Sequence, residues 1–355
     1  MLSAAIKISA TKPFHAVSNA SRSDRRRVKV SCVASHDQPD RRGLLAGLAT
    51  SLAVLPLMTP TAANAYTNKV ISGKNLSSFQ RKDLLEDFQK RSEAEIKKVV
   101  TGADAPAAMR LLFNDASTYD AVARTGGVNG SIVLSEELKR PENKDLKDLV
   151  DRLAAARKAI AAAGPPSQKT ISWADTIVLA CKLTQQMIWY DARFERNPIN
   201  GGLLAERYAN PIIVKLGRVD SDTPDNPGKV LPVGASAQEV LALSKTLGVK
   251  DPKDLEGPFA KKAPFWERVM YVLWCATQPD PAAAETALAT GAPEAFAEFK
   301  VKYERSKASN FRTDYEVDFN EYLNKLANLG AKFDNDAYLY DVTFRVPERF
   351  LISES

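Results

Sequence analysis

Histidine is almost absent from this sequence. The 355 residues contain two histidines, His15 and His36, and both lie in an amino-terminal leader that we expect to be removed. A mature chain without histidine cannot form a Ser-His-Asp triad, a Cys-His pair, or a histidine-ligated zinc or haem site. The absence of one residue type therefore excludes most familiar catalytic chemistry.

Other signatures of chemistry are missing too. There is no phosphate-binding G-x-x-x-x-G-K-[ST] loop, and the acidic residues show no metal-ligand spacing, so we expect no metal site. Strand-like alternation is nearly absent, and there is no internal repeat or low-complexity tract. Hydrophobic residues make up 45% of the chain and charged residues 26%, which is typical of a globular protein.

The first 65 residues carry two targeting signals. Residues 1–40 are basic and rich in Ser and Ala, which is typical of an organelle transit peptide. Residues 41–65 have a twin arginine, an apolar run and an A-x-A cleavage motif. A membrane anchor over residues 43–58 is the alternative, but that run is shorter than the ~20 apolar residues that a bilayer core requires. Together the signals predict the chloroplast thylakoid lumen, with cleavage after Ala65.

The mature chain is electrically neutral. The leader contains nine of the 49 basic residues and three of the 43 acidic residues, which leaves 40 of each sign. The mature chain therefore has no global field that would attract nucleic acid or anionic lipid, and we expect no nucleic-acid partner. No run in it is long and apolar enough to predict a transmembrane span.

Apolar residues recur at helical spacing along most of the mature chain, which predicts an all-α fold. Gly164-Pro165-Pro166 interrupts this pattern, so the segment 164–172 is the natural boundary between two domains. Between Arg193 and Gly228 the chain is rich in Pro, Asn and Gly, which predicts irregular connections. The predicted helices cover residues 79–99, 106–117, 145–163, 173–191, 237–247 and 264–276, with further helical periodicity over 281–329.

Six ordered motifs resemble the ascorbate peroxidases of the haem peroxidase superfamily, and they span roughly residues 78–333. The resemblance implies an all-α, two-domain haem-peroxidase fold, with a crevice between a distal domain, residues 66–170, and a proximal domain, residues 171–333. Residues 334–355 extend beyond the end of the family's pattern. The motifs are Arg110–Asp120 with Thr125–Ile132, Glu137–Asn143, Ser172–Asp175, Gly217–Asp220, Glu256–Phe259 and Asp318–Gly330.

The distal positions of this family are altered. The family's distal arginine is kept as Arg110, but its distal histidine is Asn114, and an amide cannot act as a general base near neutral pH. The neighbouring tryptophan is Phe113. Asn143 stands where the family places the amide that orients the histidine, and with that histidine lost we expect a structural role in a loop. The resemblance therefore implies a vestigial distal site.

The proximal side is altered as well. In one alignment, the segment with the family's proximal histidine is deleted ahead of Glu256–Phe259. In the alternative, Leu241–Ser244 matches the residues before that histidine, and no histidine follows there either. The tryptophan that follows Gly-Pro in the family is Phe259. At the family's ascorbate edge, a lysine and a cysteine are replaced by Gly102 and Asp104, so a cation is lost and an anion gained. We expect no haem. The alternative is haem b held by an unconventional thiolate, thioether or phenolate ligand.

Two cysteines of the mature chain, Cys181 and Cys275, each lie in an apolar helical stretch. Two buried thiols are the simpler interpretation, because free cysteine is among the most buried residue types. A disulfide between them is the alternative, since the lumen oxidises proteins.

The sequence favours a non-catalytic, peroxidase-like accessory protein of the thylakoid lumen. The family resemblance implies the lumenal face of a membrane complex as its partner, photosystem II first. The candidate interaction surfaces are the insertion Arg193–Pro211 and the aromatic-rich extension 334–355. One alternative is a lumenal L-ascorbate peroxidase that reduces hydrogen peroxide with Arg110 and an unusual haem ligand. Another is a small-molecule binding role for the vacated crevice.

Overall fold

The computed structural model describes the chain from Tyr66 onward, with gaps. The described residues are 66–203, 213–227, 231–240, 274–291 and 323–347, together with 293, 301, 304–305, 308–309 and 319–320. All of them belong to one compact unit that begins at Ala62. The targeting signals, Phe259 and residues 204–211 of the insertion lie outside the described residues, so the interpretations placed on them stay predictions.

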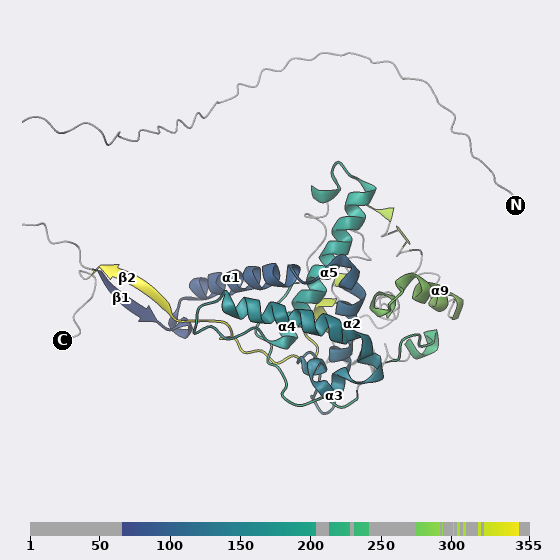
Figure 1. Cartoon of the computed structure of the whole chain (residues 1–355), viewed down its shortest axis with the longest axis horizontal. Coiled ribbons are helices and arrows are strands. Elements are labelled where there is room, and N and C mark those ends of the chain that lie inside the picture. Colours follow the sequence, from purple (N-terminus) through teal and green to yellow (C-terminus); the bar gives the residue numbers. More distant parts are fainter. Residues whose placement is uncertain are drawn as a thin grey trace, which may run out of the picture. The chain divides into compact units, whose positions relative to one another are not determined.

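Helices dominate the described chain (Figure 1), which confirms the all-α prediction. Four predicted helices begin within two residues of their predicted starts, and α5 continues to Arg196, past its predicted end at Asp191. The bounds are α1 Ser78–Lys97, α2 Ala105–Ser117, α3 Ser135–Leu138, α4 Lys147–Ala162, α5 Trp173–Arg196 and α9 Pro281–Gly291, with short 3-10 helices η1 Gly73–Asn75, η2 Gly102–Asp104, η3 Ser131–Val133 and η4 Pro141–Leu146.

Local sequence signals determine where the long helices begin. Ser77 and Gln80 form a capping box at α1: the Ser77 hydroxyl accepts the Gln80 N–H at 3.3 Å, and the Gln80 side chain accepts the Ser77 N–H at 3.1 Å. Pro106 lies in the first turn of α2, where its missing N–H removes no intrahelical bond. Ser172 caps α5 by accepting the Asp175 N–H at 3.1 Å.

α2 lies at the centre of the hydrophobic core. Every residue from Ala108 to Ser117 is buried, and α2 packs along α5, while α1 packs against both α4 and α5. α2 and α5 therefore share one core although they lie on opposite sides of the predicted domain boundary at residue 170. The boundary itself stays a prediction. In the described part of the chain, no helix has the length and apolar character needed to cross a membrane.

A two-stranded antiparallel ribbon pairs the start of the described chain with its last described residues. β1 (Tyr66–Ile71) pairs with β2 (Val342–Pro347) over the whole length of both strands. This ribbon was not predicted from the sequence, although β2 alternates Val and Phe with polar residues. An alternation of six residues is too short to stand out, and the pairing partner lies at the other end of the mature chain.

Candidate functional site

The residues of the expected distal site come together on α2. Arg110 and Asn114 lie about one turn apart on this helix, and both are buried. The Asn114 amide donates to Asn143 Oδ1 at 2.7 Å and to the Glu142 carbonyl at 3.4 Å. Asn143, in η4, donates in turn to the Glu137 carbonyl at 3.0 Å. The two amides therefore hold each other and the loop that follows α3.

This amide pair cannot replace a catalytic histidine. Neither amide gains or loses a proton near neutral pH, so neither can move a proton between the two oxygens of a peroxide. Asn143 keeps a hydrogen-bonded partner at position 114 even though that partner is Asn114 and not histidine. Phe113 is fully buried and supplies no hydrogen-bond donor from its side chain. These three side chains therefore provide hydrogen bonds and packing, and none of them can act as an acid or a base.

Arg110 keeps a guanidinium with unmet hydrogen-bonding capacity. The residue is only 7% exposed, and its buried Nε has no hydrogen-bond partner. Burial lowers the pKa of Arg110, while the carboxylate of Asp145 acts in the opposite direction. Because an arginine stays protonated in proteins, α2 carries a buried cation that an anion would stabilise.

Asp115 is a buried acid that the sequence analysis did not single out. Its two carboxyl oxygens accept the backbone N–H groups of Gly130 at 2.9 Å and Ile132 at 3.3 Å, which ties α2 to the glycine-rich loop. Burial raises the pKa of Asp115 to about 8, and the neighbouring acids Glu137 and Asp225 add to the shift. Only the tertiary structure shows this environment.

The glycine-rich loop 126–130 is shaped by its packing. Gly130 adopts a φ of +70°, and a Cβ at this position would lie 2.8 Å from the Ala174 nitrogen at the start of α5. Gly127 adopts a φ of +96°, and a Cβ there would lie 2.7 Å from the Gly330 Cα. Only glycine adopts these conformations readily and allows such close approach. The loop therefore serves the fold.

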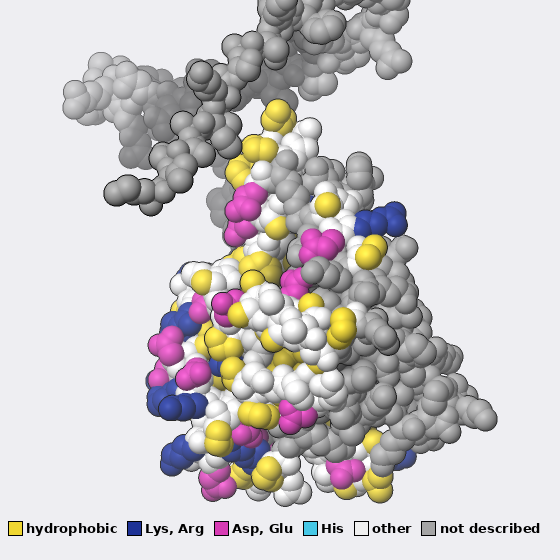
Figure 2. Space-filling model, turned by 90° about the vertical axis from the view of Figure 1, so that its right-hand side faces the viewer, with side chains coloured by type: hydrophobic (Ala, Val, Ile, Leu, Met, Phe, Trp, Pro, Cys, Tyr) yellow, Lys and Arg dark blue, Asp and Glu magenta, His cyan; other side chains and the backbone are white. Residues whose placement is uncertain are grey.

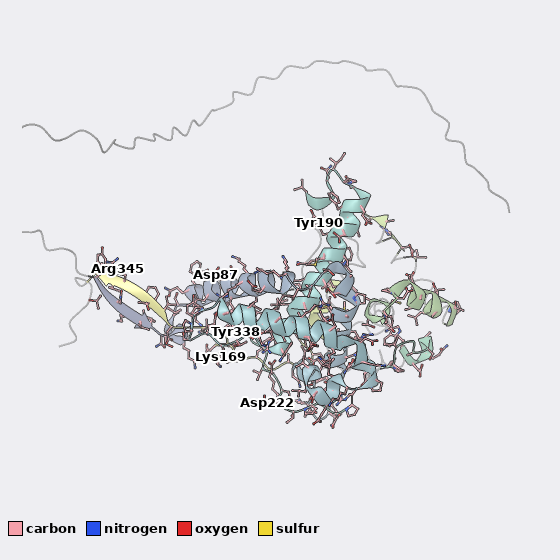
Figure 3. The ribbon with its side chains drawn as sticks, in the orientation of Figure 1. Asp87, Lys169, Tyr190, Asp222, Tyr338 and Arg345 are labelled. Atoms are coloured by element: carbon pink, nitrogen blue, oxygen red, sulfur yellow. The ribbon has the colours of Figure 1, made fainter. Side chains whose placement is uncertain are left out.

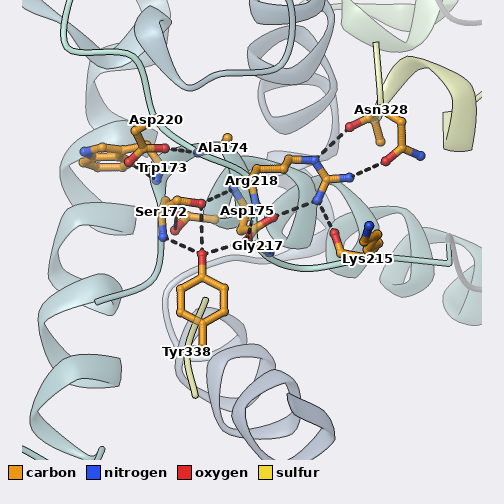
Figure 4. Close-up of polar contacts among 12 residues, drawn as sticks. Ser172, Trp173, Ala174, Asp175, Lys215, Gly217, Arg218, Asp220, Asn328 and Tyr338 are labelled. Atoms are coloured by element: carbon orange, nitrogen blue, oxygen red, sulfur yellow. Dashed lines mark hydrogen bonds and ion pairs between the residues drawn. The ribbon is translucent and has the colours of Figure 1, made fainter. Parts of the chain in front are cut away.

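A second polar cluster lies at the amino end of α5 (Figure 4). Asp175 and Arg218 form an ion pair at 2.7 Å, and both side chains are fully buried. The Asp175 carboxylate also accepts the Gly217 N–H at 2.6 Å and the Tyr338 hydroxyl at 2.7 Å. The guanidinium donates further hydrogen bonds to the carbonyls of Ala327 and Lys215 and to the side chain of Asn328.

This cluster accounts for three of the motifs that carry the family resemblance. Ser172–Asp175, Gly217–Asp220 and the segment that ends at Gly330 are distant in sequence and meet here. Asp220 contributes by accepting the N–H groups of Trp173 at 2.7 Å and Ala174 at 3.0 Å, which caps α5. These motifs hold the fold together, so their presence says nothing about catalysis.

Tyr338 brings the carboxyl-terminal extension into the same cluster. Its ring is buried and stacks on Phe88 with the ring centroids 4.2 Å apart, and its hydroxyl oxygen lies 3.1 Å from the Ser172 hydroxyl oxygen. Burial raises the pKa of Tyr338. The start of the extension 334–355 therefore docks on its own protein, and this part of it is no free interaction surface.

An ion pair occupies the edge that corresponds to the family's ascorbate site. Arg152 donates to both carboxylate oxygens of Asp104, at 2.6 and 3.1 Å, and this hydrogen bonding lowers the pKa of Asp104. The anion expected at this edge is thus neutralised by its neighbour. Gly102 packs against α5, where a Cβ would lie 3.4 Å from the Ile188 side chain.

The described thiols do not suit haem ligation. Cys181 and Cys275 are free and buried, and burial raises the pKa of both thiols to about 12, so neither is a thiolate near neutral pH. The Cys181 sulfur lies 3.9 Å from the Met109 sulfur inside the core. The chain has no histidine after His36, so the usual axial ligand of haem is missing from the rest of the sequence. Among the described residues, no cluster of His, Cys, Asp and Glu could hold a metal ion.

Arg193, the first residue of the predicted interaction insertion, is not on the surface. It lies in α5 and is 1% exposed, its Nη1 donates to the Ser309 carbonyl, and its guanidinium lies 5.4 Å from the centroid of the Trp189 ring. The expectation that this arginine offers a surface contact is therefore wrong. The cause is the extension of α5, which turns position 193 toward the protein interior.

This segment does expose several large apolar side chains, next to exposed polar residues such as Glu195 and Asn200. Tyr190 and Phe194 stack with their ring centroids 6.3 Å apart, and they are exposed together with Ile199 and Leu203. Figure 2 shows hydrophobic side chains at the top of the described surface, and Figure 3 labels Tyr190 on the projecting part of α5. We refer to Tyr190, Phe194, Ile199 and Leu203 as the α5 apolar surface.

Comparison with known proteins extends over most of the described chain. A family model described as peroxidase matches residues 88–255. A chloroplast thylakoid lumenal 29 kDa protein of Solanum lycopersicum is 33% identical over 278 residues, which cover 73% of this chain and 74% of the relative. The thylakoid lumenal 29 kDa protein of Arabidopsis thaliana is 31% identical over 293 residues, covering 79% and 77% of the two chains.

A solved structure gives the same result. The crystal structure of the TL29 protein from Arabidopsis thaliana superimposes with a TM-score of 0.60 at 30% identity, and the match covers 73% of this chain and 98% of that chain. A putative L-ascorbate peroxidase of Arabidopsis thaliana is 36% identical over 186 residues, or 47% of this chain and 49% of the relative. The described helices thus have the arrangement found in the solved relative.

Proposed function

This chain belongs to the haem peroxidase family, with thylakoid lumenal 29 kDa proteins among its relatives, and we propose that it is a non-catalytic accessory protein. It is a protein of the chloroplast thylakoid lumen, as its two targeting signals predict. A shared fold does not imply a shared activity, so the proposal rests on the site and not on the family.

The observation that carries the proposal is the hydrogen-bonded pair of Asn114 and Asn143. Peroxide cleavage needs a base at position 114, and the amide found there is engaged with Asn143 at 2.7 Å. Arg110 could still stabilise negative charge, but one positioned cation does not move protons. The burial of Cys181 and Cys275 adds a second support, because both thiols lie inside the helical core, where a haem group would displace core side chains.

We test the loss of catalysis by adding haemin to the chain that begins at Tyr66. We expect neither a sharp, stoichiometric Soret band nor ascorbate-dependent consumption of hydrogen peroxide. Arg110→Leu should behave like the parent protein in both assays. A Soret band at one haem per chain, with turnover that disappears in Arg110→Leu, would establish the alternative of a lumenal ascorbate peroxidase.

The partner that we propose is the lumenal face of a thylakoid membrane complex, photosystem II first. The α5 apolar surface supports this role, because exposed clusters of large apolar side chains are typical of interaction sites. Aromatic residues such as Tyr190 and Phe194 are enriched at the centres of protein interfaces.

We test this surface with the double variant Tyr190→Ser and Phe194→Ser in pull-down assays on purified photosystem II, with photosystem I as the comparison. The double variant should lose binding. Phe79→Ser is the matched control, because Phe79 is 71% exposed on α1 and outside the α5 apolar surface, and it should bind like the parent. Equal binding of all three proteins would exclude the α5 apolar surface as the contact.

Arg110 favours a second candidate function, the binding of a small anion. Its buried Nε–H has no partner and could donate a charge-assisted hydrogen bond to such a ligand. We expect ascorbate or inorganic phosphate to raise the melting temperature of the parent protein and not of Arg110→Leu. The absence of a shift with a screen of lumenal metabolites would remove this candidate.

A further inference from the structure

Two polar side chains on one face of α2 have hydrogen-bonding capacity that the protein does not use. Arg110 and Asn114 are four residues apart, which places them on the same face of the helix, and both are buried. No described residue accepts a hydrogen bond from the Arg110 guanidinium, and its Nε is enclosed without a partner. The Asp145 carboxylate acts on this guanidinium through space and forms no ion pair with it. Arg110 is therefore a buried cation that its own protein leaves unpaired.

The orientation of the Asn114 amide follows from its neighbours. Its nitrogen lies next to two oxygens, Asn143 Oδ1 at 2.7 Å and the Glu142 carbonyl at 3.4 Å. The Asn143 nitrogen in turn donates to the Glu137 carbonyl at 3.0 Å, so its oxygen must be the acceptor. Exchanging the oxygen and nitrogen of Asn114 would set oxygen against oxygen, so Nδ2 faces the loop and Oδ1 does not. Among the described residues, no group donates to Asn114 Oδ1.

The two side chains together offer a cation and a neutral acceptor about one helical turn apart. A guanidinium binds negatively charged oxygens through charge-assisted hydrogen bonds. An amide oxygen only accepts, so it binds a ligand atom that carries a hydrogen. An anion without a donor would leave Asn114 Oδ1 unsatisfied, and a neutral alcohol would leave the charge of Arg110 unpaired. A ligand with both an anionic oxygen and a hydroxyl group satisfies both side chains.

We propose that α2 binds a small hydroxycarboxylate, whose carboxylate pairs with Arg110 and whose hydroxyl group donates to Asn114 Oδ1. This inference rests on the second candidate function, anion binding at Arg110, and adds the chemical class of the ligand. Side chains four residues apart on a helix have Cβ atoms about 5–6 Å apart, which suits a hydroxyl group on the carbon next to the carboxylate. The neighbouring acid Asp115 is engaged elsewhere, because its oxygens accept the N–H groups of Gly130 and Ile132.

The test compares glycolate with acetate, which have the same carboxylate and differ by one hydroxyl group. Each is added over a range of concentrations at pH 7 to the chain that begins at Tyr66, and the rise in melting temperature gives the dissociation constant. Glycolate should bind about fivefold more tightly than acetate, since one hydrogen bond contributes roughly that factor. Arg110→Leu should bind neither acid. Lys144→Leu is the control, because it removes an exposed cation from η4, and it should bind both acids like the parent.

Asn114→Leu tests the acceptor. This variant keeps Arg110 and removes the amide oxygen, so acetate should still bind while the preference for glycolate disappears. The ratio of the two dissociation constants is measured within one variant, so a general loss of stability does not change it. The comparison of the two acids in the parent protein needs no variant at all.

The outcomes separate this proposal from the functions proposed above. Equal affinity of the parent for glycolate and acetate, or a preference for glycolate that persists in Asn114→Leu, would overturn the hydroxycarboxylate and leave anion binding at Arg110 in place. No shift of the melting temperature with either acid would overturn the proposal together with the second candidate function. The loss of catalysis is measured separately, by the addition of haemin.

Discussion

The two buried polar clusters differ in how completely their charges are paired. At the amino end of α5, Asp175 and Arg218 neutralise each other at 2.7 Å, and hydrogen bonds engage the rest of both groups. On α2, Arg110 has a buried Nε without a partner, and burial raises the pKa of Asp115 to about 8. The charges of the first cluster are paired, whereas the second cluster keeps a buried cation with an unpartnered Nε and a protonated acid.

This difference teaches that a family's fold and its activity rest on separate residues. Exchanging histidine for asparagine at position 114 leaves a satisfied amide pair with Asn143, so the fold is preserved. Removing Arg218 would instead leave the Asp175 carboxylate buried without the cation that neutralises it. A chain can therefore lose the catalytic group and keep all the contacts that hold its helices together.

The largest expected effect is that of Arg218→Met. Breaking one partner of a buried ion pair costs about 3–5 kcal/mol of unfolding free energy, because the remaining charge stays uncompensated. Urea denaturation followed by circular dichroism measures this loss. Arg152→Met is the control: it also removes an arginine that pairs with a carboxylate, but Arg152 is 34% exposed, so the loss should stay below about 1 kcal/mol. Equal losses of unfolding free energy in the two variants would show that the buried ion pair contributes no more than the partly exposed one.

The second expected effect is a pH dependence of the unfolding free energy, which arises from Asp115 on α2. The folded protein keeps a proton on Asp115 up to about pH 8, whereas the unfolded chain releases it near pH 4. Stability from this group is therefore complete below about pH 4 and falls as pH rises toward 8, by up to about 1.4 kcal/mol per pH unit. Denaturation at several pH values should show this slope.

Asp115→Asn is the variant that isolates this slope. It cannot ionise, so the fall in stability between pH 5 and pH 8 should become clearly shallower. Asp151→Asn is the control, because Asp151 is an exposed acid on α4, and it should keep the slope of the parent. A slope in Asp115→Asn as steep as in the parent would assign the pH dependence to other groups.

A smaller effect is expected for Tyr338→Phe. This change keeps the ring that stacks on Phe88 and removes the hydroxyl that Asp175 and Ser172 bind, so we expect a loss of about 1–3 kcal/mol. Thermal and urea denaturation measure it. Tyr340→Phe, two residues along the same extension, should change stability little, because Tyr340 is only half-buried. If both variants matched the parent, the Tyr338 hydroxyl would have no structural role.

The smallest effect is expected for Arg110→Leu. The change removes a buried cation whose Nε makes no hydrogen bond and puts an apolar side chain into a helix core. Stability should therefore stay within about 1 kcal/mol of the parent or rise. A loss as large as that of Arg218→Met would show that Arg110 has a structural partner comparable to Asp175, and the two clusters would no longer differ.

Much of the fold followed from local signals. The starts of α1 and α5 are specified by Ser77 and Ser172, whose side chains cap the helices that follow them. The alterations of the distal site were also visible in the sequence, because Asn114 and Phe113 stand at fixed offsets from Arg110 in a recognisable motif. Capping and periodicity need only residues that are close in sequence.

Contacts between distant segments were out of reach. Nothing near Tyr338 in the sequence indicates that its hydroxyl binds Asp175, more than 160 positions away. Arg193 was expected in an interaction loop and is buried in α5 because that helix runs on to Arg196. Asp104 was expected to add an anion at the edge that corresponds to the family's ascorbate site, and Arg152 on α4 neutralises it.

The sequence by itself determined that residues 37–355 contain no histidine, and this absence holds for every fold that the chain could adopt. It also determined the helices, whose hydrogen bonds join residues four positions apart. Only the tertiary structure decided which charges are paired, which tyrosine lies in the core and which two distant segments pair as a β-ribbon. Burial and electrostatic pairing depend on distance in space, and packing brings Asp175, Arg218 and Tyr338 together from segments that the sequence leaves far apart.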